Sequence, residues 1–328
     1  MIMKAAIFQD VKKIEYREDY PKPDIGEEDA LVKVHYCGIC GSDIHNFCNK
    51  MYQTPLIMGH EFSGVIEELG ADIKGFSIGD RVVGINVKLD ISQGELGGLG
   101  IFQNGGFAEY VLVPQRYLFQ VPENISLKEA VMIESFANVT RAMKLSRIGS
   151  NEKIMIIGGG NIGLSFLDTL LNVKDPDYII VIEPQEFLRK KAIEFGATDS
   201  FPPTKSKIKR FIKKHGNPTF IFDCVGNEET LMLGINMIER GGTILLEGIH
   251  KGTVELPTFL INNKEVGIKG CLSHDRDDIM ASIDLIKDER VHPGWFVSEI
   301  VKLNDLQTAF EEHLEPGERN YIKRVVEI

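Results

Sequence analysis

Three residues near the start of the chain offer the sulfur, nitrogen and oxygen atoms that can bind one metal ion. Cys40 lies in the segment Cys37-Gly-Ile-Cys-Gly-Ser-Asp-Ile-His45, and the segment Gly59-His-Glu61 follows twenty residues later. A thiolate, an imidazole and a carboxylate together suit Zn2+, and three protein ligands leave a fourth position for water or substrate. Cys40, His60 and Glu61 therefore predict a catalytic zinc site and not a closed structural one.

The spacing Cys37-x-x-Cys40 has two other interpretations. A thioredoxin-like redox pair would follow a strand and begin a helix, and a zinc ribbon would have a second Cys-x-x-Cys pair downstream. We expect neither context here. The remaining cysteines, which are Cys48, Cys224 and Cys271, stand singly, as small buried hydrophobic residues do. The Gly59-His-Glu61 segment is therefore what favours metal binding by Cys40.

Length and composition limit the possible functions. A chain of 328 residues exceeds the size at which a single core keeps growing, so we expect two domains. The net charge of −11 argues against nucleic acid as a partner, because nucleic-acid backbones select basic surfaces. The first residues lack the apolar run and small-residue cleavage site typical of a signal peptide, so we expect none, and five cysteines without paired spacing are typical of a reducing compartment. The most apolar stretch, 154–171, is interrupted by glycines and Asp168, so we expect a cytoplasmic protein without a membrane span.

A glycine-rich segment, 154–166, indicates where a dinucleotide binds. Its first four apolar residues predict a buried strand, Gly158, Gly160 and Gly163 take the G-x-G-x-x-G positions, and 164–171 continues as an apolar helix. The first glycine permits a tight turn, the second lets the main chain approach a pyrophosphate, and the third lets the helix pack on the strand. The phosphates would then rest on the helix N-terminus, where free N–H groups favour anions.

The residues after this turn strengthen the interpretation. A second predicted strand, 178–183, ends at Glu183, where a carboxylate can bind the ribose 2′-hydroxyl and repel a 2′-phosphate, which favours NAD over NADP. Arg189 either softens this preference or belongs to the solvated face of the next helix. Strands that alternate with helices as far as Gly270 predict a parallel, doubly wound sheet. The candidate cofactor contacts are Gly158, Gly160, Asn161, Ile162, Gly163, Glu183, Arg189, Val225, Gly226 and Gly248.

The N-terminal part of the chain predicts a different architecture. Residues 31–36, 62–69 and 106–113 are short strand-like runs without regular helices between them. Glycines crowd into residues 64–84, as expected of a tightly turned β-barrel in which the main chain bends without side-chain conflict. The glycine-rich segment from Gly94 to Gly106 predicts a loop. The first domain is therefore predicted to be all-β.

Together, these features resemble the medium-chain dehydrogenase/reductase family, in its zinc-dependent alcohol, polyol and threonine dehydrogenase branch. The resemblance covers nearly the whole chain, and its motifs follow the family's order: Met3-Lys-Ala-Ala6, Gly59-His-Glu61, Gly79-Asp-Arg-Val-Val83, Gly105-Gly-Phe-Ala-Glu-Tyr-Val111 and the turn 158–163. The family implies an α/β chain with a GroES-like β-barrel catalytic domain and a Rossmann domain with a doubly wound parallel sheet. It places the catalytic domain at 1–136 and 273–328, and the NAD-binding Rossmann domain at 137–272.

The resemblance implies that Cys40, His60 and Glu61 bind the catalytic zinc. Glu134 matches a position that supplies a further carboxylate near the metal, so either glutamate can be the third protein ligand. An alcohol at such a zinc has its pKa lowered from roughly 16 toward neutrality, which gives an alkoxide from which hydride can leave. Many members also carry a four-cysteine structural zinc site, but residues 85–105 contain no cysteine, so we expect one zinc per chain.

The resemblance also assigns the transfer of the proton. Ser42 and His45 match the hydroxyl and the histidine that carry it to solvent through the cofactor ribose. Asp43 matches the acid that fixes a zinc-bound histidine. From the residue types alone, Ser42 and Asp43 can also be turn residues, and His45 can be a partly exposed histidine.

The sequence thus predicts a zinc-dependent oxidoreductase that transfers a hydride between a secondary alcohol and NAD, giving the ketone. Polyols, diols, sugars and L-threonine are the substrate candidates, and the family implies a homodimer or homotetramer. Tyr52, Gln53 and Phe107 are candidates for lining the substrate pocket. Two alternatives remain open. They are an NAD(P)-binding protein of the same fold without catalysis, and a zinc-independent reductase, whose members lack the Cys40 and His60 pair.

Overall fold

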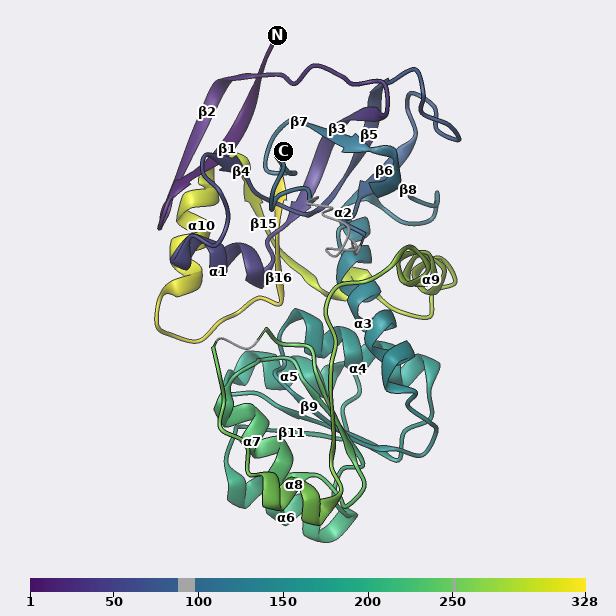
Figure 1. Cartoon of the computed structure of the whole chain (residues 1–328), viewed down its shortest axis with the longest axis vertical. Coiled ribbons are helices and arrows are strands. Elements are labelled where there is room, and N and C mark those ends of the chain that lie inside the picture. Colours follow the sequence, from purple (N-terminus) through teal and green to yellow (C-terminus); the bar gives the residue numbers. More distant parts are fainter. Residues whose placement is uncertain (88–97, 250–251) are drawn as a thin grey trace. The chain divides into compact units, whose positions relative to one another are not determined.

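The computed structural model describes residues 1–87, 98–249 and 252–328, and the chain divides into two units. Unit 1 contains residues 1–134, 293–317 and 323–328, and unit 2 contains residues 135–292 and 318–322. The two ends of the chain belong to the same unit, because the last strand, β16, pairs with β3 (Figure 1). Among the described residues, none of the helices combines the length and the apolar character needed to cross a bilayer.

Unit 1 is built mainly from antiparallel strands, which confirms the predicted all-β first domain. One sheet has the order β2-β1-β4, and a larger sheet has the order β15-β16-β3-β5-β6-β8, with β7 also paired to β3. The strands are β1 (Ile2–Asp10), β2 (Lys13–Pro21), β3 (Asp29–Gly38), β4 (Leu56–Ile57), β5 (Glu61–Leu69), β6 (Arg81–Gly84), β7 (Tyr110–Pro114), β8 (Leu118–Gln120), β15 (Val297–Lys302) and β16 (Lys323–Glu327). The predicted runs 31–36 and 62–69 lie within β3 and β5, whereas only the end of the run 106–113 is strand, in β7.

Short helices complete the core of unit 1. They are α1 (Gly41–Asn49), α2 (Leu127–Ala130) and α10 (Leu306–Leu314). Phe47 of α1 and Phe310 of α10 meet edge to face, with ring centroids 5.2 Å apart, and Phe107 packs on Phe310 at 6.1 Å. Phe107 is fully buried, so core packing accounts for this candidate pocket residue. The predicted loop from Gly94 to Gly106 lies partly outside the described residues.

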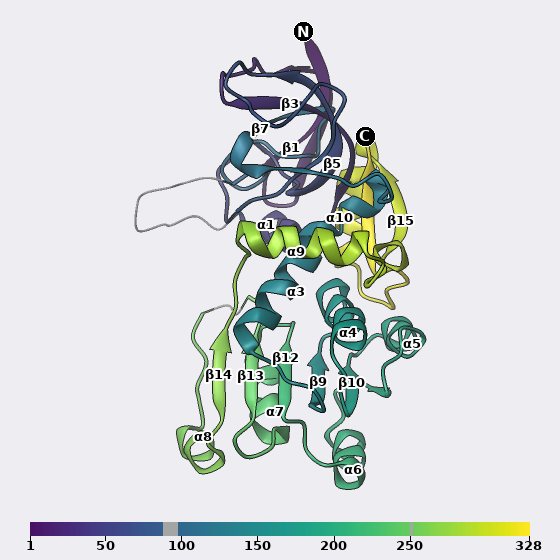
Figure 2. The ribbon, with the colours of Figure 1, turned by 90° about the vertical axis from the view of Figure 1, so that its right-hand side faces the viewer.

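Unit 2 contains a parallel sheet with the strand order β11-β10-β9-β12-β13-β14, which confirms the predicted doubly wound fold. Figure 2 shows β10, β9, β12, β13 and β14 side by side and flanked by helices. The strands are β9 (Lys153–Ile157), β10 (Tyr178–Ile182), β11 (Asp199–Phe201), β12 (Phe220–Asp223), β13 (Thr243–Leu246) and β14 (Gly267–Gly270). The helices are α3 (Ile133–Ser146), α4 (Asn161–Val173), α5 (Glu186–Glu194), α6 (Lys205–His215), α7 (Glu228–Met237), α8 (Thr258–Lys264) and α9 (Arg276–Lys287).

The boundary of unit 2 differs from the predicted one on its C-terminal side. Residues 273–292, which we assigned to the catalytic domain, group with unit 2. Ion pairs join α3 to α9 and its N-cap: Arg141 Nη1 lies 2.8 Å from Asp275 Oδ2, and Lys144 Nζ lies 3.5 Å from Asp278 Oδ1. These contacts hold α9 against a helix of the parallel-sheet unit.

Candidate metal centre and cofactor turn

Strand pairing brings the two metal-ligand segments together. β3 and β5 are antiparallel, and Gly38 at the end of β3 pairs with Glu61 at the start of β5. Cys40 follows β3 and His60 precedes β5, so both lie at the same edge of the sheet. Gly59 has a φ of +91°, and a Cβ atom on it would lie 2.7 Å from Sγ of Cys37, so only glycine fits before His60.

The ligand atoms of Cys40, His60 and Glu61 form one cluster. One atom from each residue lies within 4.8 Å of the other two. Tetrahedral zinc holds sulfur at about 2.3 Å and nitrogen or oxygen at about 2.0 to 2.2 Å, so a cluster of this size accommodates the ion with small side-chain movements. His60 and Glu61 are buried and Cys40 is partly exposed, which leaves one side of the cluster open to a ligand from outside. The donor set therefore fits a catalytic zinc.

Neighbours on α1 fix the imidazole of His60. Its Nδ1 lies 3.4 Å from Oδ1 of the fully buried Asp43, and its Nε2 lies 3.3 Å from Oγ of Ser42. The other carboxylate oxygen of Asp43 accepts a hydrogen bond of 3.0 Å from the N–H of Cys40. Burial lowers the pKa of His60, but the negative charges of Asp43 and Cys40 outweigh burial and hold that pKa well above 6.5. The negative charges around this imidazole therefore favour a positive charge beside them. A metal cation bound to His60 would supply that charge.

The two cysteines of the Cys37-x-x-Cys40 spacing lie in different elements. Cys40 is the N-cap of α1, whereas Cys37 lies within β3, so the pair does not begin a helix as a redox pair would. Cys37 is also fully buried in the core of unit 1, and burial raises the pKa of its thiol well above 9.0. A thiol that stays protonated is a poor redox partner, so the structure gives no support to a redox pair.

Two further predicted residues lie around this cluster. His45 follows Ser42 by one turn of α1 and is partly buried. Glu134, in the first turn of α3, is partly buried and is not one of the three clustered ligands. Its charge nevertheless acts on Glu61, whose pKa is raised by burial and further by Glu134.

One residue of the centre was missed in the sequence. Lys323 forms a buried ion pair with Glu61, with side chains that are 3% and 1% exposed respectively. Burial lowers the pKa of Lys323, but the charge of Glu61 outweighs it and leaves that pKa above 10.5. A single lysine far from any motif gives little signal. The available hint was a pair of basic residues inside the short apolar strand that ends the chain, Tyr321-Ile-Lys-Arg-Val-Val326.

The glycine-rich turn of unit 2 has the conformation that its three glycines predicted. Gly158 has a φ of +97° directly after β9, and Gly160 is the N-cap of α4. A Cβ atom on Gly163 would overlap the carbonyl oxygen of Gly158, whereas a Cβ atom on Gly160 would meet nothing within 4 Å. The turn therefore packs tightly on the inside and leaves open space at Gly160, on the helix N-terminus where anions bind.

Glu183 is joined to this turn by hydrogen bonds. Its Oε2 accepts from the N–H of Gly159 at 2.8 Å, and its Oε1 accepts from the N–H of Gln185 at 2.9 Å. Arg189 donates from Nη1 to the carbonyl oxygen of Glu183 at 2.9 Å and also to that of Pro184. The guanidinium of Arg189 is thus tied to the main chain after β10.

The other predicted cofactor residues lie at the carboxyl ends of the same sheet. Val225 and Gly226 follow β12, and their N–H groups donate to Oδ1 of Asp223 at 3.1 and 3.2 Å. A Cβ atom on Gly248 would lie 2.4 Å from N of Gly226, so the two main chains are in contact. Asn161 and Ile162 begin α4, and Asn161 Nδ2 donates to Ser135 Oγ at 2.8 Å.

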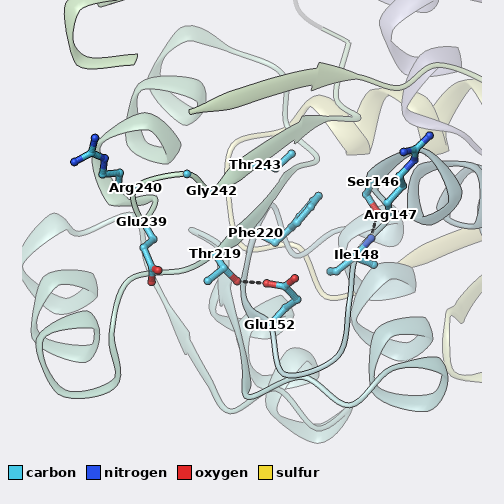
Figure 3. A pocket seen from close by; sticks show the side chains of 11 residues that line it. Ser146, Arg147, Ile148, Glu152, Thr219, Phe220, Glu239, Arg240, Gly242 and Thr243 are labelled. Atoms are coloured by element: carbon cyan, nitrogen blue, oxygen red, sulfur yellow. Dashed lines mark hydrogen bonds between the residues drawn. The ribbon is translucent and has the colours of Figure 1, made fainter. Parts of the chain in front are cut away.

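A cavity of about 280 Å³ lies at the opposite end of this sheet (Figure 3). It is lined by Ser146, Arg147, Ile148, Glu152, Thr219, Phe220, Glu239, Arg240, Gly241, Gly242 and Thr243. Figure 3 shows Thr219 donating to Glu152, a hydrogen bond of 2.5 Å, while Arg147 and Arg240 point away from that pair. Phe220 and Thr243 begin β12 and β13, so the cavity is at the amino ends of strands whose carboxyl ends carry the predicted cofactor residues. None of the predicted site residues lines it.

Comparison with known protein families agrees with this geometry. Residues 26–123 match the alcohol dehydrogenase GroES-like domain, and residues 169–288 match the zinc-binding dehydrogenase family. The two matches together cover more than half of the chain. Fold, metal-ligand cluster and family matches define a zinc-binding alcohol dehydrogenase of two domains.

Three proteins of known class are similar to this chain over nearly its full length. The D-xylulose reductase of Saccharomyces cerevisiae is 27% identical over 325 residues, covering 91% of this chain and 90% of that protein. The 2R,3R-butanediol dehydrogenase of Bacillus subtilis has a similar structure, with a TM-score of 0.89, 26% identity and 99% of each chain covered. A protein of Sinorhizobium meliloti classed as a zinc-binding dehydrogenase, bound to NADP, has a TM-score of 0.90, 27% identity and complete coverage of both chains. The chain belongs to the medium-chain dehydrogenase/reductase family, and NAD or NADP together with a catalytic zinc is typical of its zinc-binding dehydrogenases.

Proposed function

We propose that this protein oxidises a secondary alcohol to the ketone with NAD, at one zinc ion per chain bound by Cys40, His60 and Glu61. The observation that carries the proposal is the cluster of one sulfur, one nitrogen and one oxygen atom within 4.8 Å of one another. Zinc at such a site supplies a Lewis acid that lowers the pKa of a substrate hydroxyl. Because residues 85–105 contain no cysteine, we propose no second, structural zinc.

The side chains around the cluster have separate roles in this proposal. Asp43 orients His60 through Nδ1, which leaves Nε2 for the metal. Ser42 Oγ lies 3.3 Å from that Nε2, so it is close enough to the ligands to take the hydroxyl proton of the substrate. His45, three residues further on α1, lies on the same helix face as Ser42 and passes the proton on toward solvent.

Glu61 and Glu134 are the two carboxylates that can act as the third ligand. Glu61 belongs to the cluster, and the charge of Glu134 acts on Glu61 and on Lys323. We propose that Glu61 ligates the metal first and that Glu134 is the alternative ligand.

NAD is the proposed cofactor. The carboxylate of Glu183 is fixed beside the glycine-rich turn by the N–H groups of Gly159 and Gln185. In this position it would accept from a ribose hydroxyl and repel a 2′-phosphate. The contacts of Arg189 with two main-chain carbonyl oxygens support a structural role for this residue.

The substrate class is proposed from the printed activities of the relatives. A D-xylulose reductase and a butanediol dehydrogenase act on molecules with neighbouring hydroxyl or carbonyl groups. We therefore place diols and polyols first among the candidates, before sugars and L-threonine.

A homo-oligomer in the cytoplasm is the proposed setting. β14 is the last strand of its sheet, and apolar side chains near it are exposed: 83% for Phe259 and 64% for Leu272. An open sheet edge beside exposed apolar residues favours pairing with a second copy. The five free cysteines are in keeping with a reducing compartment.

Metal analysis followed by an activity screen tests the proposal. The purified protein is expected to contain one zinc per chain and to reduce NAD with at least one diol, polyol, sugar or L-threonine. A metal-free preparation should bind NADH and show no turnover until zinc is restored. Full activity without metal would overturn the proposal in favour of a zinc-independent reductase. Binding of NADH and zinc without turnover of any alcohol would favour a nucleotide-binding protein without catalysis.

A further inference from the structure

Lys323 brings a positive charge to the metal centre from the far end of the chain. It begins β16, and its Nζ forms an ion pair with Oε2 of Glu61. Its own N–H is held by the carbonyl oxygen of Phe296 at 3.1 Å and by Oγ of Ser298 at 3.3 Å. With a side chain only 3% exposed, this lysine is a fixed part of the centre.

A glycine provides the space for the ion pair. Gly38 of β3 pairs with Glu61 of β5 on one side and with Val325 of β16 on the other. A Cβ atom on Gly38 would lie 2.8 Å from Cε of Lys323 and would overlap Oε2 of Glu61. Three strands therefore converge on a slot that admits the carboxylate and the ammonium because residue 38 has no side chain.

Glu61 therefore stands between Lys323 and the position that the proposed metal would take. One of its carboxylate oxygen atoms belongs to the cluster with Cys40 and His60, and the carboxylate is also paired with Lys323. A buried ammonium without a partner is strongly unfavourable, because its lost hydration is not replaced. Lys323 therefore needs a carboxylate whether or not a metal is bound.

We propose that Lys323 is a positioning residue that competes with the metal for the carboxylate of Glu61. This inference rests on the proposed function. A carboxylate that shares its charge with an ammonium is a weaker metal ligand than an unshared one, so Glu61 would hold the metal less tightly while Lys323 is present. Without Lys323, the whole charge of Glu61 would be available to the metal, and the affinity of the site would rise.

Metal affinity in four variants tests this competition. Lys323→Met, which keeps the length of the side chain and removes its charge, should bind zinc roughly tenfold more tightly in competition with a coloured chelator. Lys323→Arg keeps the charge and should stay close to the original affinity. In a Glu61→Gln background the Lys323→Met change should have little further effect, because the carboxylate for which lysine and metal compete is gone. The double variant buries no lone charge, so it tests the proposal even if Lys323→Met alone folds poorly.

Spectra of the Co2+-substituted protein give a second readout. Visible absorption of Co2+ reports its coordination, and Lys323→Met should shift the spectrum toward that of a site with one more ligand, whereas Lys323→Arg should not. Lys22→Met is the matched control, because Lys22 is also nearly buried and paired with Glu67 and Glu68 but lies outside the cluster. Unchanged zinc affinity and an unchanged spectrum in Lys323→Met would overturn the inference and leave the proposed function standing. An equal gain in affinity with and without the Glu61 carboxylate would also overturn it. Failure of the unaltered protein to bind zinc would overturn both.

Discussion

The metal centre of unit 1 is built from side chains, whereas the glycine-rich turn of unit 2 is built from main chain. In the metal centre, Cys40, His60 and Lys323 come from three separate parts of the sequence and meet because β3, β5 and β16 are neighbours. In the turn, Gly158 to Gly163 are six consecutive residues whose shape depends on the absence of side chains. The first site depends on which atoms are present, and the second on which atoms are missing.

This difference leads to opposite expectations for mutations. A substitution at the metal centre that preserves volume still removes a ligand atom, so chemistry should be lost while the fold remains. A substitution in the turn adds atoms to a closely packed backbone, so the fold or the cofactor should be affected while the metal remains. Each expectation can be tested with a pair of closely matched variants.

The largest effect is expected from Cys40→Ser. It replaces a thiolate by a hydroxyl of similar size, and a neutral hydroxyl is a poor zinc ligand. Zinc should be lost, and alcohol oxidation should fall at least about a thousandfold, because Lewis-acid stabilisation of several kcal/mol disappears. Binding of NADH, followed by its fluorescence, should change less than about twofold, because the turn of unit 2 contributes no ligand to the cluster.

Cys48→Ser is the control for this substitution. Cys48 lies on the same helix, α1, but is not one of the clustered ligands. It should keep its zinc and its turnover. If Cys40→Ser retained one zinc per chain and normal turnover, the side-chain account of the metal centre would be wrong.

The second effect is expected from alanine at two glycines of the turn. In Gly163→Ala the new Cβ would overlap the carbonyl oxygen of Gly158, so the turn must shift, and the free energy of unfolding should fall by about 1 to 3 kcal/mol. In Gly160→Ala the Cβ meets nothing within 4 Å, so stability should change by less than about 1 kcal/mol. The same Cβ would occupy the space where a pyrophosphate approaches, and NADH binding should weaken roughly tenfold or more.

Denaturant unfolding, NADH titration and zinc analysis separate these two cases. Both variants should keep their zinc, since the turn contributes no atom to the cluster. Equal losses of stability in Gly160→Ala and Gly163→Ala would show that the packing at Gly163 has no special importance. Unchanged NADH affinity in Gly160→Ala would place the pyrophosphate elsewhere.

The same contrast explains how much could be predicted from the sequence. The turn and the strands around it were predictable because their signals are local: glycines at fixed spacing and apolar runs of strand length. Cys40, His60 and Glu61 were recognisable because each lies in a short motif, although only the pairing of β3 with β5 brings them together. The geometry of the site depends on pairings that no local pattern records.

Two features could not be predicted, for physical reasons. Lys323 joins Glu61 through strand pairing between segments from opposite ends of the chain, and a lone lysine gives no spacing to recognise. α9 groups with unit 2, where ion pairs join it and its N-cap to Arg141 and Lys144, more than a hundred positions away. Both features involve ion pairs between residues that are far apart in the sequence. The residue types alone do not show which acidic side chain pairs with which basic one.

The smallest expected effect concerns Glu183, a side chain that acts within the main-chain site. Glu183→Gln removes a negative charge and keeps the shape, so repulsion of a 2′-phosphate should fall by about 1 to 2 kcal/mol and the ratio of kcat/KM for NADP over NAD should rise about tenfold. Only one of the two N–H groups now bound, those of Gly159 and Gln185, can keep an oxygen acceptor, so a loss of stability of about 1 to 3 kcal/mol is expected as well. Glu194→Gln, an exposed substitution on α5, should change neither quantity. If the NADP to NAD ratio stays unchanged in Glu183→Gln although stability falls, the carboxylate serves only to hold the turn, and even this side chain acts through the main chain.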